Sequence, residues 1–257
     1  MPKQGNSAEE YEDAFAYAGR TVAVADGASE SSYAEFWAQG LVRNFVRSCP
    51  NWSNEKPNTL ATWVQPLQEE WDRHIPWDRL PWYAEEKARS GAFAAFIGLR
   101  FDGTHEETCK AGFWRRLFGR RKGRSNRWHA IAIGDCCLFQ IREGTLISAF
   151  PLTLAEQFSS RPVLLSSRAD QNQQAWAGLR TTEGDFQDGD LFILATDALS
   201  QWILTPDPAG TERWRKLAVL KDENGFSRLV EQLRNSGDLR NDDTTLVLCK
   251  WKGANPA

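Results

Sequence analysis

The first third of the chain opens with two strands and continues as helices. Two short apolar runs, Ala14–Ala18 and Thr21–Ala25, flank Gly19-Arg20 and predict a β-hairpin. Beyond the hairpin, apolar residues recur at helical spacing, which predicts amphipathic helices. One helix is expected to start within residues 29–32 and to run to residue 47. After a linker from Pro50 to Pro57, two more are expected at residues 59–72 and 81–90.

The rest of the chain returns to strands. Continuous apolar runs predict buried strands at Ala92–Phe101, Trp128–Ile133, Cys136–Ile141, Leu191–Thr196 and Thr244–Trp251. Gly134-Asp135 separates two of these runs and predicts a hairpin turn. Residues 151–185 are polar and irregular apart from a short helix near 154–158. Helices are expected at residues 198–204, 211–219 and 226–235. This order does not alternate strand with helix, so it favours an antiparallel-rich α+β fold with helices layered on sheets.

Composition narrows the class of protein. The chain has 257 residues, of which 41% are hydrophobic and 25% charged, and we expect a single domain over residues 1–257. The net charge of −3 argues against a general nucleic-acid binder. No apolar run is long enough for a transmembrane helix and the N-terminal residues lack an apolar signal segment, so we expect a cytoplasmic protein. The five cysteines form no CxxC pair, and the three histidines are not spaced as ligand pairs. Any metal ion must therefore be held by carboxylates.

Aspartates recur where apolar strands begin or end, at Asp13, Asp26, Asp135, Asp197 and Asp242. Each one alone fits a turn or a helix cap, which is the commoner role. If the sheets pack face to face, however, several of these carboxylates could converge at one edge. Such a cluster needs cations to stay ionised. Carboxylates with a backbone carbonyl, which Gly27 would let approach closely, suit Mg²⁺ or Mn²⁺.

Six motifs carry a family resemblance in residue type, order and approximate spacing. They are Glu12-Asp13-Ala14-Phe15, Val24-Ala25-Asp26-Gly27, Ser90-Gly91-Ala92-Phe93-Ala94, Ile133-Gly134-Asp135, Leu194-Ala195-Thr196-Asp197 and Asp242-Asp243-Thr244-Thr245. From about residue 3 to residue 251 the chain resembles the metal-dependent protein phosphatases of type 2C, as in bacterial serine/threonine phosphatases. The resemblance implies a four-layer α-β-β-α sandwich of two mainly antiparallel sheets flanked by helices. It also implies hydrolysis of phosphoserine and phosphothreonine in phosphoprotein substrates, by a water that bridges two Mn²⁺ or Mg²⁺ ions.

The resemblance assigns metal ligands residue by residue. Asp26 would bridge the two ions, and the carbonyl of Gly27 would bind the second. Asp197 and Asp242 would complete the protein ligands of the first ion, and Asp135 with Asp197 would hold a weaker third. Asp243 is the alternative to Asp242; the latter is favoured because Thr245 then follows at the family's spacing.

The resemblance also assigns groups around the ions. Glu12 and Asp13 would hold the metal-bound waters. The family's phosphate-gripping arginine is absent, so Lys3 is expected to take its role, with Arg20 as the fallback. Lysine supplies a point charge without the bidentate fork of arginine.

Departures from the family pattern leave a second function open. Ala28, Phe93 and Ala198 replace residues that the family commonly has at these places, and Ala28 supplies no side-chain acid for the leaving group. The alternative is a non-catalytic member of the same fold that binds a phosphoprotein or regulates a partner.

Two loops carry further expectations. Residues 159–188 could form the flap that the family places beside its active site, or a plain surface excursion. Residues 105–127 form a basic insertion between two strands. Its stretch 110–127 holds eight basic residues, no acidic one and interleaved aromatics. It could dock an acidic partner or an anionic surface, or it could be a solvated loop whose aromatics pack on the domain.

Overall fold

The computed structural model describes residues 1–50, 57–102 and 126–251, and these form two antiparallel β-sheets. In the larger sheet the strand order is β1-β2-β3-β4-β8, and β7 pairs with β3. Its strands are β1 (Ala14–Ala18), β2 (Thr21–Gly27), β3 (Phe93–Asp102), β4 (Arg127–Ile133), β7 (Leu165–Ser166) and β8 (Arg180–Asp185). In the smaller sheet the order is β10-β9-β5-β6. Its strands are β5 (Cys137–Arg142), β6 (Thr145–Phe150), β9 (Leu191–Ala195) and β10 (Leu246–Lys250).

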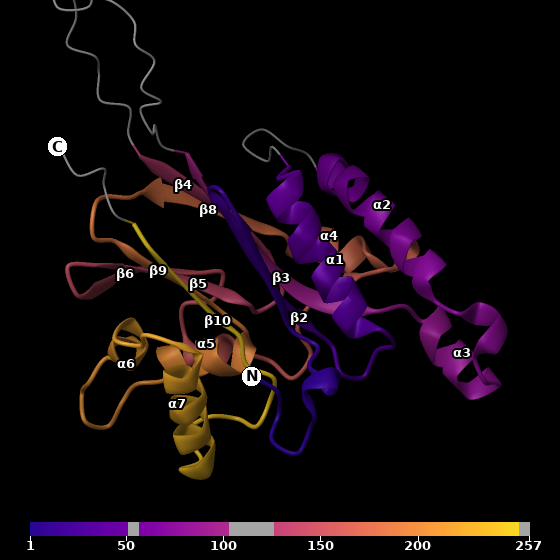
Figure 1. The fold of residues 1–257 in the computed structure, drawn as a ribbon. Coiled ribbons are helices and arrows are strands. Elements are labelled where there is room, and N and C mark those ends of the chain that lie inside the picture. Colours follow the sequence, from indigo (N-terminus) through magenta and orange to yellow (C-terminus); the bar gives the residue numbers. More distant parts are fainter. Residues whose placement is uncertain (51–56, 103–125, 252–257) are drawn as a thin grey trace, which may run out of the picture.

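Helices cover the outer face of each sheet, so the molecule has four layers (Figure 1). The helices are α1 (Ala34–Arg47), α2 (Pro57–His74), α3 (Trp82–Arg89), α4 (Gln173–Gly178), α5 (Asp197–Leu204), α6 (Trp214–Ala218) and α7 (Glu223–Asn235). Helices α1 and α2 pack on the larger sheet, and α5, α6 and α7 pack on the smaller one. A third apolar cluster fills the space between the sheets. The expected α-β-β-α sandwich of two antiparallel sheets is therefore confirmed.

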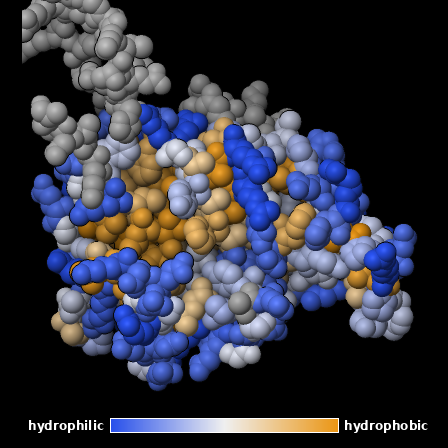
Figure 2. Space-filling view, viewed as in Figure 1, coloured by the Kyte–Doolittle hydropathy of each residue, from blue (hydrophilic) through white to orange (hydrophobic). Residues whose placement is uncertain are grey.

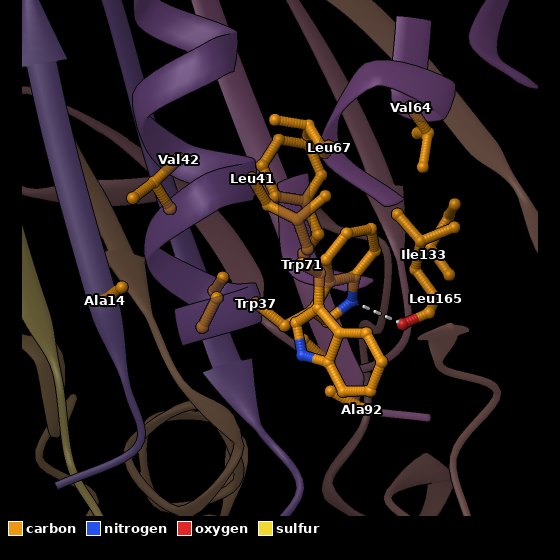
Figure 3. Packing of buried hydrophobic residues seen from close by; sticks show 14 of the residues in the cluster. Ala14, Trp37, Leu41, Val42, Val64, Leu67, Trp71, Ala92, Ile133 and Leu165 are labelled. Atoms are coloured by element: carbon orange, nitrogen blue, oxygen red, sulfur yellow. Dashed lines mark hydrogen bonds between the residues drawn. The ribbon is translucent and has the colours of Figure 1, made fainter. Parts of the chain in front are cut away.

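Helix α1 fits closely against the larger sheet because its apolar residues share one face. Trp37, Leu41 and Phe45 recur every four residues and are almost fully buried. The indole nitrogen of Trp37 donates a hydrogen bond of 2.9 Å to the carbonyl of Leu165 in β7 (Figure 3). A Cβ atom at Gly98 of β3 would lie 2.4 Å from the ring of Phe45, so this contact requires glycine.

The hairpin predicted at Gly134-Asp135 is wrong. Strand β4 pairs with β3 and β8 in the larger sheet, whereas β5 pairs with β6 and β9 in the smaller one. The turn therefore carries the chain from one sheet to the other, and Trp128 and Leu138 meet in the core between the sheets. Gly134 has a φ of 92°, which glycine adopts without steric cost. A tight glycine turn suits both connections, so the local sequence does not distinguish them.

The segment 151–185 is more regular than expected. It contains β7, α4 and β8, and the strand β6 just before it was also not predicted. Strand β8 lies at the edge of the larger sheet, where one face and one edge meet solvent, so its residues are mostly polar. Strands β7 and β8 both belong to the predicted flap 159–188, and both pair with strands of the larger sheet. A flap role for these residues stays a prediction. Residues 103–125, which hold most of the basic insertion, lie outside the described residues, and the docking hypothesis stays a prediction too.

An apolar surface lies along the open edge of the sandwich beside β10 (Figure 2). Here a hollow of about 390 Å³ opens between the β1–β2 hairpin and β10. The side chains of Phe15 and Tyr17 stand exposed beside it, and Trp251 closes one end. Within the described part of the chain, no helix is both long and apolar enough to cross a membrane.

Candidate active site

The strand registers bring all five strand-end aspartates to one end of the sandwich. Ala14 pairs with Ala25, so Asp13 and Asp26 lie side by side at the end of the β1–β2 ladder. In the smaller sheet, Ala195 of β9 pairs with both Cys137 and Leu246. The residues that precede β5 and β10 and the residue that follows β9 therefore meet at the same end. These segments carry Asp135, Asp242 and Asp197.

The side chain of Asp26 is influenced by the negative charges of all four other aspartates of this cluster. Burial raises its pKa well above the ordinary value for aspartate, and the charges of the neighbouring carboxylates add to that shift. These neighbours, in decreasing order of effect, are Asp13, Asp197, Asp135 and Asp242. The structure thus brings together carboxylates from both sheets, as the sequence predicted for strand-end aspartates.

Asp13 is buried and only half satisfied by hydrogen bonds. Its Oδ2 atom accepts a bond of 2.8 Å from the hydroxyl of Thr245, which in turn contacts the hydroxyl of Tyr11. Its Oδ1 atom has no partner among the described residues. Burial raises the pKa of Asp13 to about 8, although the bond from Thr245 opposes the shift. An unpartnered carboxylate oxygen in such a place is costly unless a cation or water meets it.

Asp135 presents a second unpartnered oxygen. The turn between β4 and β5 buries its side chain, and its Oδ2 atom meets no hydrogen-bond partner among the described residues. Burial, with the charge of Asp197 next, raises the pKa of Asp135 to about 7. Burial likewise raises the pKa of Asp197, against the opposing charge of Arg240.

Asp242 and Asp243 have separate roles in the structure. Asp243 is buried, and its two oxygens accept backbone N–H bonds of 2.7 Å from Lys3 and 2.8 Å from Glu12. It therefore holds the N-terminal segment in place. The side chain of Asp242 is one-third exposed and faces the cationic groups of Lys3 and Arg240. The charge of Asp242 acts on Asp26, Asp135 and Asp197, whereas the charge of Asp243 acts on Asp13.

Lys3 and Arg20, the two residues expected to bind the substrate's phosphate, lie at very different distances from the carboxylate cluster. The Lys3 ammonium lies 3.8 Å from Asp242, so it stands at the cluster. Burial raises the pKa of Glu12, with the charge of Asp243 adding to the shift, while a bond from Ser29 and the charge of Lys3 oppose it. Arg20 lies in the β1–β2 turn, six residues from Asp26, or about 20 Å along the strand. The structure therefore does not bring Arg20 to the carboxylates.

Gly27 ends β2 in a space that admits no side chain. A Cβ atom there would lie 2.7 Å from the carbonyl oxygen of Glu12 and 3.1 Å from Ala34. Real Cβ atoms do not approach backbone so closely, because the repulsion would force the strands apart. The glycine thus lets the start of β1, the end of β2 and the start of α1 close up beside Asp26.

Sequence reasoning missed Arg240. Its guanidinium makes ion pairs with both Asp197 and Asp242, at 3.2 Å for the second. Nearby, Arg234 donates hydrogen bonds to the carbonyls of Pro2 and Asp242 and so fixes the loop before β10. The only signal in the sequence was a basic residue two positions before an acidic pair, which is common on protein surfaces.

The donor set fits a divalent cation of the Mg²⁺ or Mn²⁺ kind. Oxygen ligands dominate, and the unpartnered oxygens of Asp13 and Asp135 are what a cation or its waters would satisfy. Among the described residues, no three acidic, histidine or cysteine side chains converge closely enough to chelate one ion directly. Mg²⁺ typically keeps several waters and binds through one or two carboxylates, so spaced carboxylates still suit it.

Comparison with solved structures places this fold among known enzymes. The serine/threonine phosphatase PstP/Ppp of Mycobacterium tuberculosis superposes with a TM-score of 0.61 at 16% identity, covering 98% of this chain and 96% of that one. The catalytic domain of PstP in complex with two manganese ions gives 0.56 at 16% identity, with 96% and 95% covered. The PPM Ser-Thr phosphatase MsPP of Mycobacterium smegmatis, in complex with cacodylate, gives 0.55 at 16% identity, with 98% and 97% covered.

The chain thus has the fold of the PPM, or type 2C, serine/threonine phosphatases over nearly its whole length, and the resemblance seen in the motifs is confirmed at the level of the fold. No protein-family model matches the sequence, and no curated protein matches it. At 16% identity the structural likeness shows the fold alone.

Proposed function

We propose that this protein is a metal-dependent serine/threonine protein phosphatase that uses two Mn²⁺ or Mg²⁺ ions. The observation that carries the proposal is the convergence of carboxylates from both sheets at one end of the sandwich, with unpartnered oxygens on Asp13 and Asp135. Five neighbouring carboxylates, two of them buried and three partly buried, are unfavourable in their charged form without cations. The two manganese ions bound by the PstP catalytic domain, which shares the fold, support the choice of metal.

In this proposal each acidic residue has a separate role toward the cations. Asp26, at the centre of the cluster, would contact both ions, with the carbonyl of Gly27 on the second. Asp197 and Asp242 would hold the first ion from the smaller sheet. Asp135, beside Asp197, would hold a weaker third ion.

The remaining groups would position water and substrate. Glu12 and Asp13 would accept hydrogen bonds from water beside the ions, and the Thr245 bond would keep the Asp13 carboxylate oriented. Bound cations would lower the pKa of a shared water and neutralise charge on the phosphoryl oxygens. The Lys3 ammonium stands next to Asp242, where it can attract the phosphate of a phosphoserine or phosphothreonine side chain.

The proposal is tested by para-nitrophenyl phosphate and phosphopeptide hydrolysis with and without Mn²⁺. Wild-type protein should be active only with the metal. Asp26→Asn and Asp197→Asn should each abolish turnover, because an amide is a weaker, uncharged metal ligand, while circular dichroism shows an intact fold. Asp78→Asn, which changes an exposed carboxylate in the 3-10 turn Trp77–Arg79, is the matched control and should keep full activity.

Two results would overturn the proposal. Wild-type turnover by both site variants at saturating Mn²⁺ would show that the site is wrongly assigned. A folded wild-type protein that hydrolyses neither substrate with any tested divalent ion would instead favour a non-catalytic phosphoprotein-binding role.

A further inference from the structure

Arg240 lies where the proposed metal ligands of the smaller sheet meet. It sits in the loop between α7 and β10, two residues before Asp242. Its Nη2 atom contacts an oxygen of Asp197 and lies 3.2 Å from an oxygen of Asp242. One guanidinium therefore bridges a carboxylate that follows β9 and a carboxylate that precedes β10.

This bridge compensates part of the cluster's negative charge. Among the described ion pairs, the cluster's carboxylates are paired by Arg240 and by Lys3, whose ammonium is 3.8 Å from Asp242. Asp13 and Asp135 each keep an unpartnered oxygen. Without Arg240, Asp197 would face its acidic neighbours with no ion pair of its own.

A cation held by Asp197 and Asp242 would need the same two carboxylates. A guanidinium is always charged, so it cannot leave them by losing a proton. A divalent ion placed between the two side chains would repel it and would compete for their oxygens. The side chain of Arg240 is 45% exposed, so it has solvent into which it can turn.

We propose that Arg240 is an internal counter-ion that bridges Asp197 and Asp242 in the metal-free protein and competes with the divalent cation for them. The inference rests on the proposed function, because it takes these two carboxylates as metal ligands. By linkage, whatever stabilises the metal-free state weakens metal binding by the same free energy. Removing Arg240 should therefore tighten the binding of Mn²⁺.

The test is isothermal titration calorimetry of the full chain with Mn²⁺ alone. We expect Arg240→Ala to lower the Kd by about fivefold, which is what a partly exposed ion pair contributes. The Kd of Arg240→Lys for Mn²⁺ should fall between those of wild type and Arg240→Ala, because an ammonium lacks the planar fork of a guanidinium and cannot bridge the carboxylates in the same way. Arg89→Ala is the matched control, since it removes an exposed arginine–carboxylate pair with Glu85 in α3 and should leave the Kd unchanged.

Thermal unfolding gives a second readout that does not depend on activity. Arg240→Ala should unfold at a lower temperature than wild type without metal, and saturating Mn²⁺ should then raise its Tm by more than it raises that of wild type. Circular dichroism of each variant confirms that the fold is retained.

The outcomes separate this inference from the proposed function. If wild type and Arg240→Ala bind Mn²⁺ with equal Kd, or if the variant binds more weakly, Arg240 is not a competitor and only this inference fails. If Arg240→Lys binds like wild type, charge alone matters and the bridge is refuted. If none of the proteins binds Mn²⁺ at millimolar concentration, the metal site itself is wrong, and both proposals fall.

Discussion

At the scale of the residue, the two candidates for binding the substrate's phosphate, Lys3 and Arg20, differ both in chemistry and in position, and their positions decide between them. The ammonium of Lys3 lies 3.8 Å from a carboxylate oxygen of Asp242. Arg20 lies at the far end of β2, about 20 Å along the strand from Asp26. A side chain can bind the substrate's phosphate only where it reaches the cations. Position therefore favours the lysine, although arginine is the better partner for a phosphate.

We expect Lys3→Ala to raise KM for para-nitrophenyl phosphate by about fivefold, as the loss of one partly exposed charge contact of about 1 kcal/mol would do. Steady-state kinetics at saturating Mn²⁺ measure this effect, and calorimetry with Mn²⁺ should show no weakening of metal binding. The matched control, Arg20→Ala, should leave both constants unchanged. An unaltered KM in Lys3→Ala would move phosphate binding to another cation.

At the scale of the element, an ion pair between Arg142 and the buried Asp190 ties the end of β5 to the start of β9 within the smaller sheet. Asp190, just before β9, has a side chain only 1% exposed. It accepts hydrogen bonds from Arg142 at 2.7 and 2.9 Å and from Gln140 at 2.8 Å. Burial alone would raise the pKa of Asp190, but the bonds from Arg142, Gln187 and Gln140 outweigh it, and the pKa is lowered. The charged form is therefore the one that the fold stabilises.

Asp190→Ala should lower the free energy of unfolding by about 3 kcal/mol, because it leaves the Arg142 guanidinium without its buried partner. Urea denaturation measures the change. Asp78→Ala, which removes an exposed carboxylate in the 3-10 turn Trp77–Arg79, is the control and should lower the free energy of unfolding far less.

Because the pKa of Asp190 is lower in the folded state than in the unfolded state, its contribution is fully present above about pH 4. That contribution is lost as the pH falls through the folded-state pKa. The difference in unfolding free energy between wild type and Asp190→Asn should therefore shrink below pH 4. A difference that stays constant down to pH 2 would show that the carboxylate is not stabilised in its charged form.

At the scale of the whole molecule, the proposed ligands come from both sheets. Asp26 is the last residue but one of β2 in the larger sheet, and Asp197 and Asp242 flank strands of the smaller one. A cation bound among them would join the two halves of the sandwich at one end. Metal binding should then stabilise the entire fold instead of a single loop.

Mn²⁺ at a hundred times its Kd should add about 2.7 kcal/mol to the stability of the wild-type protein. For a chain of this size that corresponds to a rise in Tm of roughly 5–10 °C. Differential scanning calorimetry with and without Mn²⁺ measures it. Asp26→Asn should lose most of the rise and the control Asp78→Asn should keep it. A rise of the same size in both variants would place the stabilising ion elsewhere.

The sequence by itself determined most of the elements and the identity of the acidic residues. Strand and helix patterns depend on neighbours two to four positions away, so β1, β2, β3, α1 and β9 lie close to where periodicity predicts them. The placement of aspartates at strand ends is equally local. Their convergence at one edge was expected if the sheets pack face to face, and the packing of the sheets and the strand registers bear it out.

Only the tertiary structure decided which strands pair and which cation meets which carboxylate. The Gly134-Asp135 turn has the same local chemistry in a hairpin and in a crossing between sheets; the pairing of β4 with β8 and of β5 with β9 settles it. The polar sequence of β8 predicts a loop, and only its position at the edge of the sheet explains why it forms a strand. Nothing in the local sequence distinguishes Arg20 from Arg240. The length of β2 places Arg20 far from the carboxylates, whereas the loop before β10 places Arg240 in contact with Asp197. These are contacts between residues far apart in the chain, and no local pattern encodes them.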